Sequence, residues 1–89
     1  MSVYLLDGKD MTSREVAFRV IKEQLQFPEY FGHNLDALYD CLSELPKEAS
    51  IVIVNETNLR FCLEEYGEKI LACFRDAAEE CGFTLVEKD

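Results

Sequence analysis

Ile51-Val52-Ile53-Val54 is the stretch of this chain that decides its fold. Four consecutive β-branched residues predict a β-strand, because side chains branched at Cβ fit an extended, pleated backbone. The run shows no alternation of apolar and polar residues, which is typical of a strand covered on both faces at the centre of a parallel sheet. We therefore expect a buried central strand, with the rest of the chain arranged around it.

Two helices are expected before this strand, one on each side of a loop that contains Pro28. The first begins at Thr12, which forms a capping-box pattern with Glu15, and it ends before Pro28 because proline cannot donate a helical hydrogen bond. The second begins with Asn34 as its cap and stops at Pro46. Apolar residues three and four positions apart predict the buried faces of both helices: Val16, Ala17, Val20, Ile21, Leu25, Leu35, Leu38, Leu42 and Leu45.

Two more helices and a last strand are expected after the central strand. Residues 57–81 have a helical pattern with a break at Gly67, and Gly82 is a suitable C-terminal cap. The longer of these helices carries an apolar stripe formed by Ile70, Leu71, Phe74, Ala77, Ala78 and Cys81. A run at residues 83–86 predicts the last strand, and a run at residues 3–6, closed by the turn pair Asp7-Gly8, predicts the first.

The expected order of elements is therefore βααβααβ within a single domain over residues 1–89. Connections long enough to hold two helices favour parallel strands. The predicted fold class is α/β, a three-stranded parallel β-sheet packed with four helices. Because 48% of the 89 residues are apolar, the chain can bury roughly 60% of its unfolded surface without a metal or disulfide.

The four cysteines give no sign of a metal or redox site. They form no Cys-x-x-Cys pair and the chain has one histidine, so we expect no metal and no other cofactor. We interpret them as reduced, mostly buried thiols, with a reactive thiol as the alternative. The start of the chain has no signal-peptide pattern, and no apolar run approaches the ~20 residues that span a bilayer. A cytoplasmic protein that binds no membrane is therefore expected.

The composition is strongly acidic, with 18 Asp and Glu against nine Lys and Arg and a net charge of −9. This balance disfavours nucleic-acid binding, in which basic side chains replace counterions, and favours a basic partner. No Lys or Arg occurs between Lys22 and Lys47. That window holds Glu23, Glu29, Asp36, Asp40 and Glu44. An ordinary solvated acidic face is the alternative interpretation.

Asp36, Asp40 and Glu44 are spaced four residues apart, so they fall on one side of the second predicted helix, with Tyr39 beside them. Like charges at this spacing destabilise a helix by roughly 0.2–0.5 kcal/mol per pair. Helix stability therefore does not explain why three carboxylates share this face. A role in binding would explain why these three carboxylates share one face.

The loop before this helix is rich in aromatic residues. We expect Phe27 or Phe31 to pack inward while Tyr30 stays reachable from solvent, and Gly32 to give the backbone its shape. A tyrosine beside unpaired carboxylates is typical of the residues that dominate protein interfaces.

Residues 27–42, FPEYFGHNLDALYDCL, closely resemble the signature of the barstar-like family of ribonuclease inhibitors. The resemblance implies the same α/β fold and a protein inhibitor, not an enzyme, whose carboxylates occupy the place of substrate phosphate in a guanyl-specific ribonuclease. The implied partner is a basic secreted ribonuclease or ribonuclease-type toxin domain, bound by an inhibitor that is monomeric when free. With the acidic helix, it predicts partner contacts centred on Asp40 and formed by Tyr30, Phe31, Gly32, Asn34, Leu35, Asp36, Tyr39, Asp40, Ser43, Glu44, Asp76 and Glu80.

Some of these positions depart from the family pattern. Tyr39, Phe31 and Asp76 stand where the family has tryptophan, tyrosine and glutamate, and residues 43–47 lack its Gly-Trp pair after the helix. The rim of the interface is therefore expected to differ.

Two other functions are alternatives to ribonuclease inhibition. An enzyme could use Asp36 and Asp40 as acid and base or as cation ligands, but the chain has no nucleophile motif and no Gly-rich phosphate loop, and His33 reads as a solvated loop residue. The stronger rival is an acidic interaction or immunity module that binds a different basic protein. The same acidic helix would serve either partner.

Overall fold

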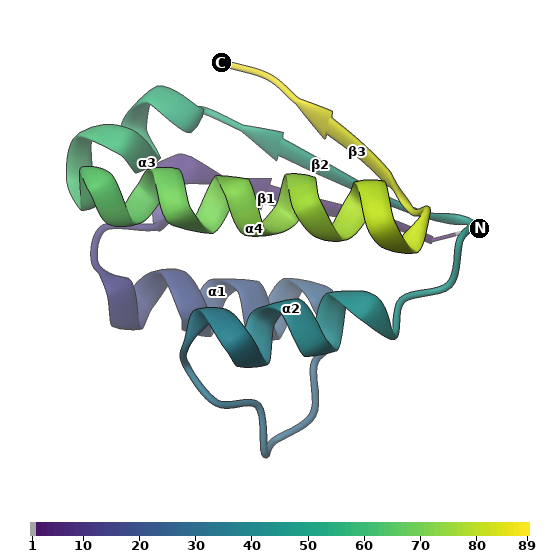
Figure 1. Cartoon of the computed structure of the whole chain (residues 1–89). Coiled ribbons are helices and arrows are strands. Elements are labelled where there is room, and N and C mark those ends of the chain that lie inside the picture. The colour runs from purple at the N-terminus through teal and green to yellow at the C-terminus, as the bar shows by residue number, and fades with distance from the viewer. Residues whose placement is uncertain (1) are drawn as a thin grey trace.

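Strand β2 (Ala49–Val54) lies at the centre of a three-stranded parallel sheet, between β1 (Ser2–Asp7) and β3 (Thr84–Glu87). This is seen in a computed structural model that describes residues 2–89 (Figure 1). The register aligns Leu5 with Val52 and Val86, and the next row aligns Tyr4 with Ile51 and Leu85.

Four helices join the strands in the expected order βααβααβ: α1 (Arg14–Leu25), α2 (Leu35–Ser43), α3 (Glu56–Leu63) and α4 (Glu65–Cys81). A 3-10 helix, η1 (Gly8–Asp10), follows β1. Helix α1 packs against β1, α4 packs against β3, and α2 runs alongside α4 (Figure 1). The predicted α/β class, with three parallel strands and four helices, is confirmed.

The prediction that the central strand is covered on both faces is wrong. Ile51 and Ile53 point into the core, whereas Val52 and Val54 lie on the opposite face and are only half-buried. On that face Val3 is 65% and Leu5 54% exposed, because α1, α2 and α4 all lie on the other side of the sheet (Figure 1). Neighbouring strands shelter the outer valines, so an apolar run does not require a second helical layer.

Capping residues in the sequence predict most of the observed helix ends. Asn34 Oδ1 accepts a hydrogen bond from the Ala37 amide at 2.8 Å and caps α2, and Gly82 ends α4 in the left-handed conformation with φ 91°. The cap of α1 is Ser13, not Thr12, because the Ser13 Oγ accepts from the Val16 amide at 3.2 Å. Helix α2 ends at Ser43, earlier than the Pro46 boundary.

The expected helix break at Gly67 is also wrong. The break lies at Glu64, whose backbone has φ 55° and ψ −128°, and Gly67 is a buried residue inside α4. A Cβ at Gly67 would lie 3.0 Å from the carbonyl oxygen of Leu59 in α3. The glycine therefore allows the two helices to pack closely.

The core lies between the sheet and the helices. Its largest buried side chains include Phe18, Phe74, Leu38, Leu42 and Ile70. Phe18, which was not assigned to the buried face of its helix, is 1% exposed.

The cysteines are free, but the expectation of mostly buried thiols is wrong. Cys62 is exposed on α3 and Cys41, Cys73 and Cys81 are half-buried. Burial raises the pKa of Cys41 and raises that of Cys73 to about 11, with nearby carboxylates as further causes. Both thiols are therefore less nucleophilic than an ordinary cysteine.

Within residues 2–89, no helix has the length and apolar character needed to cross a membrane. The same residues contain no group of three or more His, Cys, Asp or Glu side chains arranged to hold a metal ion.

Candidate functional site

The loop between α1 and α2 is fixed by its backbone. Gln26 adopts the left-handed conformation that ends α1, the Phe27 amide donates to Lys22 O, and the Phe31 amide donates to Pro28 O at 2.9 Å. The loop therefore presents its side chains from a defined turn.

The aromatic rings of this loop divide between core and surface. Phe31 is 6% exposed, and its ring lies 5.2 Å from that of Phe27 and 6.2 Å from that of Phe18. Tyr30 is 85% exposed. The prediction that Phe27 or Phe31 packs inward while Tyr30 stays reachable is confirmed. As a consequence Phe31, proposed as a contact residue, offers little surface to a partner and mainly anchors the loop.

Helix α2 carries three exposed carboxylates, those of Asp36 and Asp40 and, at its C-terminal cap, Glu44. In the described part of the chain, none of them forms an ion pair with Lys or Arg. Ser43 Oγ donates to the carbonyl oxygen of Asp40 at 2.6 Å, so this hydroxyl stabilises the end of the helix and leaves the carboxylates free. These carboxylates can accept hydrogen bonds from the cations of a partner.

Helix α4 brings further carboxylates to α2. Tyr39 Oη donates to the carboxylate of Glu80, which joins the two helices. The Cys73 thiol lies under the same junction, 3.7 Å from the carbonyl oxygen of Leu35, and the charges of Asp76 and Asp36 both contribute to its raised pKa. The fold therefore gathers residues more than 40 positions apart into one acidic surface, formed by Asp36, Asp40, Glu44, Asp76 and Glu80.

Other predicted contact residues support this surface from below. Asn34 uses its side chain to cap α2, and a Cβ at Gly32 would lie 3.1 Å from the Asn34 Nδ2 atom. Leu35 is half-buried and packs against the core. These three residues position the surface more than they extend it.

One charged pair of the loop was not foreseen. Lys22 Nζ lies 3.1 Å from Glu29 Oε2, although Glu29 is almost fully exposed. Helix α1 ends at Leu25, before Glu29, so the pair depends on how the loop turns and gave no signal in the sequence. Glu29 is therefore less available to a partner than Asp36 or Asp40.

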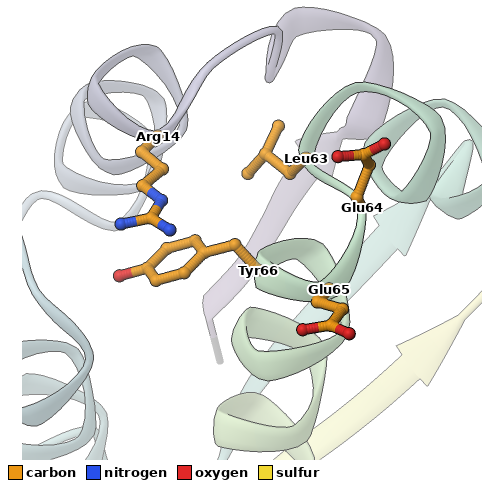
Figure 2. A pocket seen from close by; sticks show the side chains of 5 residues that line it. All are labelled: Arg14, Leu63, Glu64, Glu65 and Tyr66. Carbon is orange, nitrogen blue, oxygen red and sulfur yellow. The ribbon is translucent and has the colours of Figure 1, made fainter.

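A separate open pocket of about 400 Å³ lies at the other end of α4. It is lined by Arg14, Leu63, Glu64, Glu65 and Tyr66 (Figure 2). The Arg14 guanidinium carbon lies 3.9 Å from the centre of the Tyr66 ring, so this cation is engaged in a cation–π contact. The lining contains no Ser, Thr, Cys or His, so the pocket lacks the pairing of a hydroxyl or thiol nucleophile with an imidazole base.

Among the matches with known proteins, a family model and a relative span almost the whole chain. A family model described as "Barstar (barnase inhibitor)" matches residues 1–88. A protein of Bacillus subtilis (strain 168) named "Putative ribonuclease inhibitor YrdF" is 36% identical over 83 residues, which cover 90% of this chain and 89% of that protein. Both helices of the acidic surface lie within the residues that the family model matches.

Proposed function

The chain belongs to the Barstar family, and we propose that it inhibits a ribonuclease by laying its acidic surface over the cationic active site of that enzyme. The family and the inhibitor-named relative support a ribonuclease-inhibitor-like role and indicate an inhibitor rather than an enzyme. The observation that carries the proposal for this chain is a surface of five carboxylates, of which the three on α2 have no cationic partner within residues 2–89.

The chemistry of a ribonuclease explains why such a surface inhibits. An enzyme that cleaves a phosphodiester must hold its negative charge with Arg, Lys or His side chains. Carboxylates form short, charge-assisted hydrogen bonds with the same groups, often two at once with arginine. We place Asp40 at the centre because it is exposed, lies midway along the acidic face of α2 and is flanked by Asp36 and Glu44. Occupancy of the site blocks RNA without any reaction.

The surface is organised before a partner arrives. The Asn34 cap fixes the start of α2, the bond from Tyr39 to Glu80 ties α2 to α4, and the backbone bonds of residues 26–34 hold Tyr30 beside them. Binding then orders few additional side chains, which reduces the entropy lost on association.

The partner that we propose is a basic, secreted ribonuclease or ribonuclease-type toxin domain of the guanyl-specific class. The inhibitor would act as an immunity protein in the cytoplasm of the cell that makes the enzyme. Net charge −9 on the inhibitor favours rapid encounter with a basic enzyme of this kind.

A titration of ribonuclease activity tests the proposal. Purified protein is added to a guanyl-specific ribonuclease encoded in the same genome, and cleavage of RNA is followed as the ratio approaches one to one. We expect activity to fall linearly to a low residual level near equal amounts. Full activity at a large molar excess of the protein would contradict the proposal.

A different basic protein is the second candidate partner. The departures from the family pattern at Tyr39 and within residues 43–47 favour it, because they change the side chains that a partner of this helix would meet. The titration separates the candidates when it is paired with a binding measurement on the same ribonuclease. Absence of both binding and inhibition would favour the second candidate.

A further inference from the structure

Glu56, the first residue of α3, is a buried carboxylate that the acidic surface does not use. It is 5% exposed, and among residues 2–89 it is the one charged residue in the buried class. Its Oε1 atom lies 3.5 Å from the Arg60 guanidinium, but its Oε2 atom has no hydrogen-bond partner. A buried polar atom without a partner costs roughly 1–3 kcal/mol.

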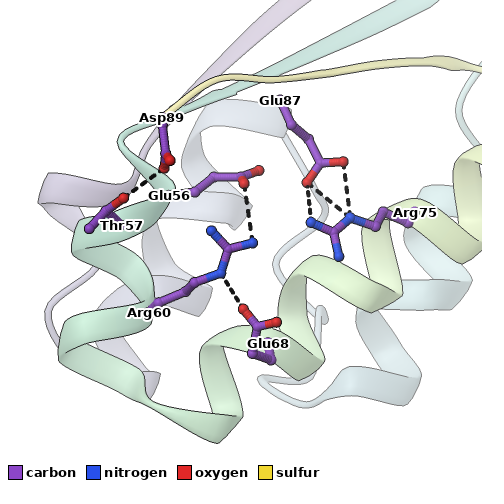
Figure 3. A network of polar contacts seen from close by, with 7 residues as sticks. All are labelled: Glu56, Thr57, Arg60, Glu68, Arg75, Glu87 and Asp89. Carbon is purple, nitrogen blue, oxygen red and sulfur yellow. Dashed lines mark hydrogen bonds and ion pairs between the residues drawn. The ribbon is translucent and has the colours of Figure 1, made fainter.

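The cations near Glu56 are already engaged, as Figure 3 shows. Arg60 is shared with Glu68 of α4. Arg75 of α4 binds Glu87 of β3 through three hydrogen bonds of 3.0, 3.0 and 2.7 Å. Figure 3 shows the Glu87 carboxylate in the same cluster as the Glu56 carboxylate, and the charge of Glu87 acts on Glu56.

The remaining charged groups at this end of the sheet are also accounted for. Asp7 at the end of β1 accepts from Asn55 Nδ2 at 2.8 Å and from the Lys9 amide at 2.9 Å. Lys9 and Asp10 of η1 and Lys88, which follows Glu87, are exposed, and Asp89 accepts from Thr57 Oγ1 at 2.7 Å. Among the charged groups of this cluster, Glu87 therefore remains as the partner of Glu56 Oε2. Two carboxyl groups can form a hydrogen bond only when one of them carries a proton.

We propose that Glu56 carries a proton in the folded protein and donates it to the Glu87 carboxylate, forming a proton-dependent latch between α3 and β3. The latch joins residues on two elements that are 31 positions apart. It satisfies the orphaned oxygen and leaves both arginines with their observed partners.

Electrostatics places the proton on Glu56. The pKa of Glu56 is raised from 4.5 to about 7, chiefly by burial and then by the hydrogen bond to Glu87 and the Glu87 charge, against smaller opposing effects of Arg60 and Arg75. The pKa of Glu87 is lowered, chiefly by its hydrogen bonds with Arg75. The latch is therefore closed well below pH 7 and opens as the pH rises through about 7, and its contribution to stability is fully present below about pH 4.5.

Strand β3 is the element that the latch secures. It has four residues and pairs only with β2, with one further bond from the Lys88 amide to Ile53 O at 2.8 Å. Its outward residues are exposed. Loss of the Glu56 proton places two carboxylates side by side at the end of this short edge strand, so β3 should fray first at alkaline pH.

Glu56→Gln tests the latch, because an amide can donate to Glu87 at any pH. Unfolding by urea is measured for the wild type and the variant at pH 5.5 and pH 8.0. Between these values the unfolding equilibrium constant of the wild type should rise roughly thirtyfold more than that of Glu56→Gln. Glu68→Gln, which alters an exposed partner of Arg60, should retain the wild-type rise. Parallel profiles for the wild type and Glu56→Gln would overturn the proposal.

A direct titration covers the case in which Glu56→Gln folds poorly. Carbon-13 NMR of the side-chain carboxyl groups in the wild type should give Glu56 a midpoint near 7. In Glu87→Gln, whose amide can donate to an ionised Glu56, the midpoint should move toward 4.5. A wild-type midpoint near 4.5, or one that Glu87→Gln leaves unchanged, would contradict a shared proton.

Discussion

Asp40 and Glu44 occupy positions that α2 itself disfavours. Asp40 is one turn from both Asp36 and Glu44, and like charges at this spacing repel. Glu44 lies at the C-terminal end of α2, where the helix dipole favours cations, and the last turn contains no basic residue. These carboxylates therefore reduce the stability of the free protein, and the cations of a partner would relieve the repulsion.

At the residue scale this predicts that neutralising Glu44 stabilises the free protein. Glu44→Gln should raise the free energy of unfolding by about 0.5 kcal/mol, since it removes a charge from the unfavourable end of α2. Glu15→Gln is the matched control, because Glu15 lies in the first turn of α1, where a carboxylate is favourable, and its loss should lower stability. Urea unfolding at neutral pH measures both. Equal effects of the two variants would show that the dipole argument is wrong.

At the element scale, the packing of α3 against α4 depends on the absence of a side chain at Gly67. The backbone of Leu59 approaches the position of a Gly67 Cβ to 3.0 Å. Neither atom could move easily, because the Leu59 oxygen belongs to the backbone of α3 and a Cβ at residue 67 would be bonded directly to the backbone of α4. The turn at Glu64, where φ is positive, joins the two helices at this close contact.

Gly67→Ala therefore sets two effects against each other. Alanine favours helix over glycine by about 1 kcal/mol, but forcing a methyl group into a closed contact costs about 1–3 kcal/mol. We expect the contact to win and the free energy of unfolding to fall by about 1 kcal/mol. Thermal or urea unfolding shows which effect is larger, because the two effects change the free energy of unfolding in opposite directions. A more stable Gly67→Ala would mean that the helices can separate at little cost.

Elements with local signals were predictable from the sequence, and contacts between distant residues were not. Asn34 and Gly82 act on amides and backbone angles within a few residues, so their roles could be read from the chain. Thr12 and Ser13 are adjacent and both can cap a helix, so the boundary of α1 was displaced by one residue. The role of Gly67 depends on Leu59 across a helix junction, and no local pattern reveals it.

The same division holds for the candidate site. The acidic face of α2 follows from four-residue spacing, and the exposure of Tyr30 beside a buried Phe31 follows from the crowding of aromatic residues in a short loop. Glu80 could be named as a contact, but its bond from Tyr39 requires the packing of α2 on α4. The proposed pairing of Glu56 with Glu87 likewise depends on the position of β3 beside β2.

For the whole molecule, the net charge of −9 and the acidic surface make separable contributions to binding. Net charge acts at long range on the rate of encounter, and salt screens it beyond about 10 Å at 0.1 M ionic strength. Contacts at the surface act at short range and mainly set the rate of dissociation. Two variants with the same change in net charge, one inside and one outside the acidic surface, can therefore separate the effect of net charge from the effect of contacts.

The comparison of Asp40→Asn with Asp10→Asn tests the central claim most directly. Both replace an exposed aspartate and raise the net charge by one, but Asp10 lies in η1, outside the acidic surface. Inhibition constants against a guanyl-specific ribonuclease encoded in the same genome are measured for both at fixed salt. Asp40→Asn should weaken inhibition by about a hundredfold or more, as expected for a central charged contact, while Asp10→Asn changes it by less than about threefold. Equal small losses would contradict an inhibitory surface centred on Asp40.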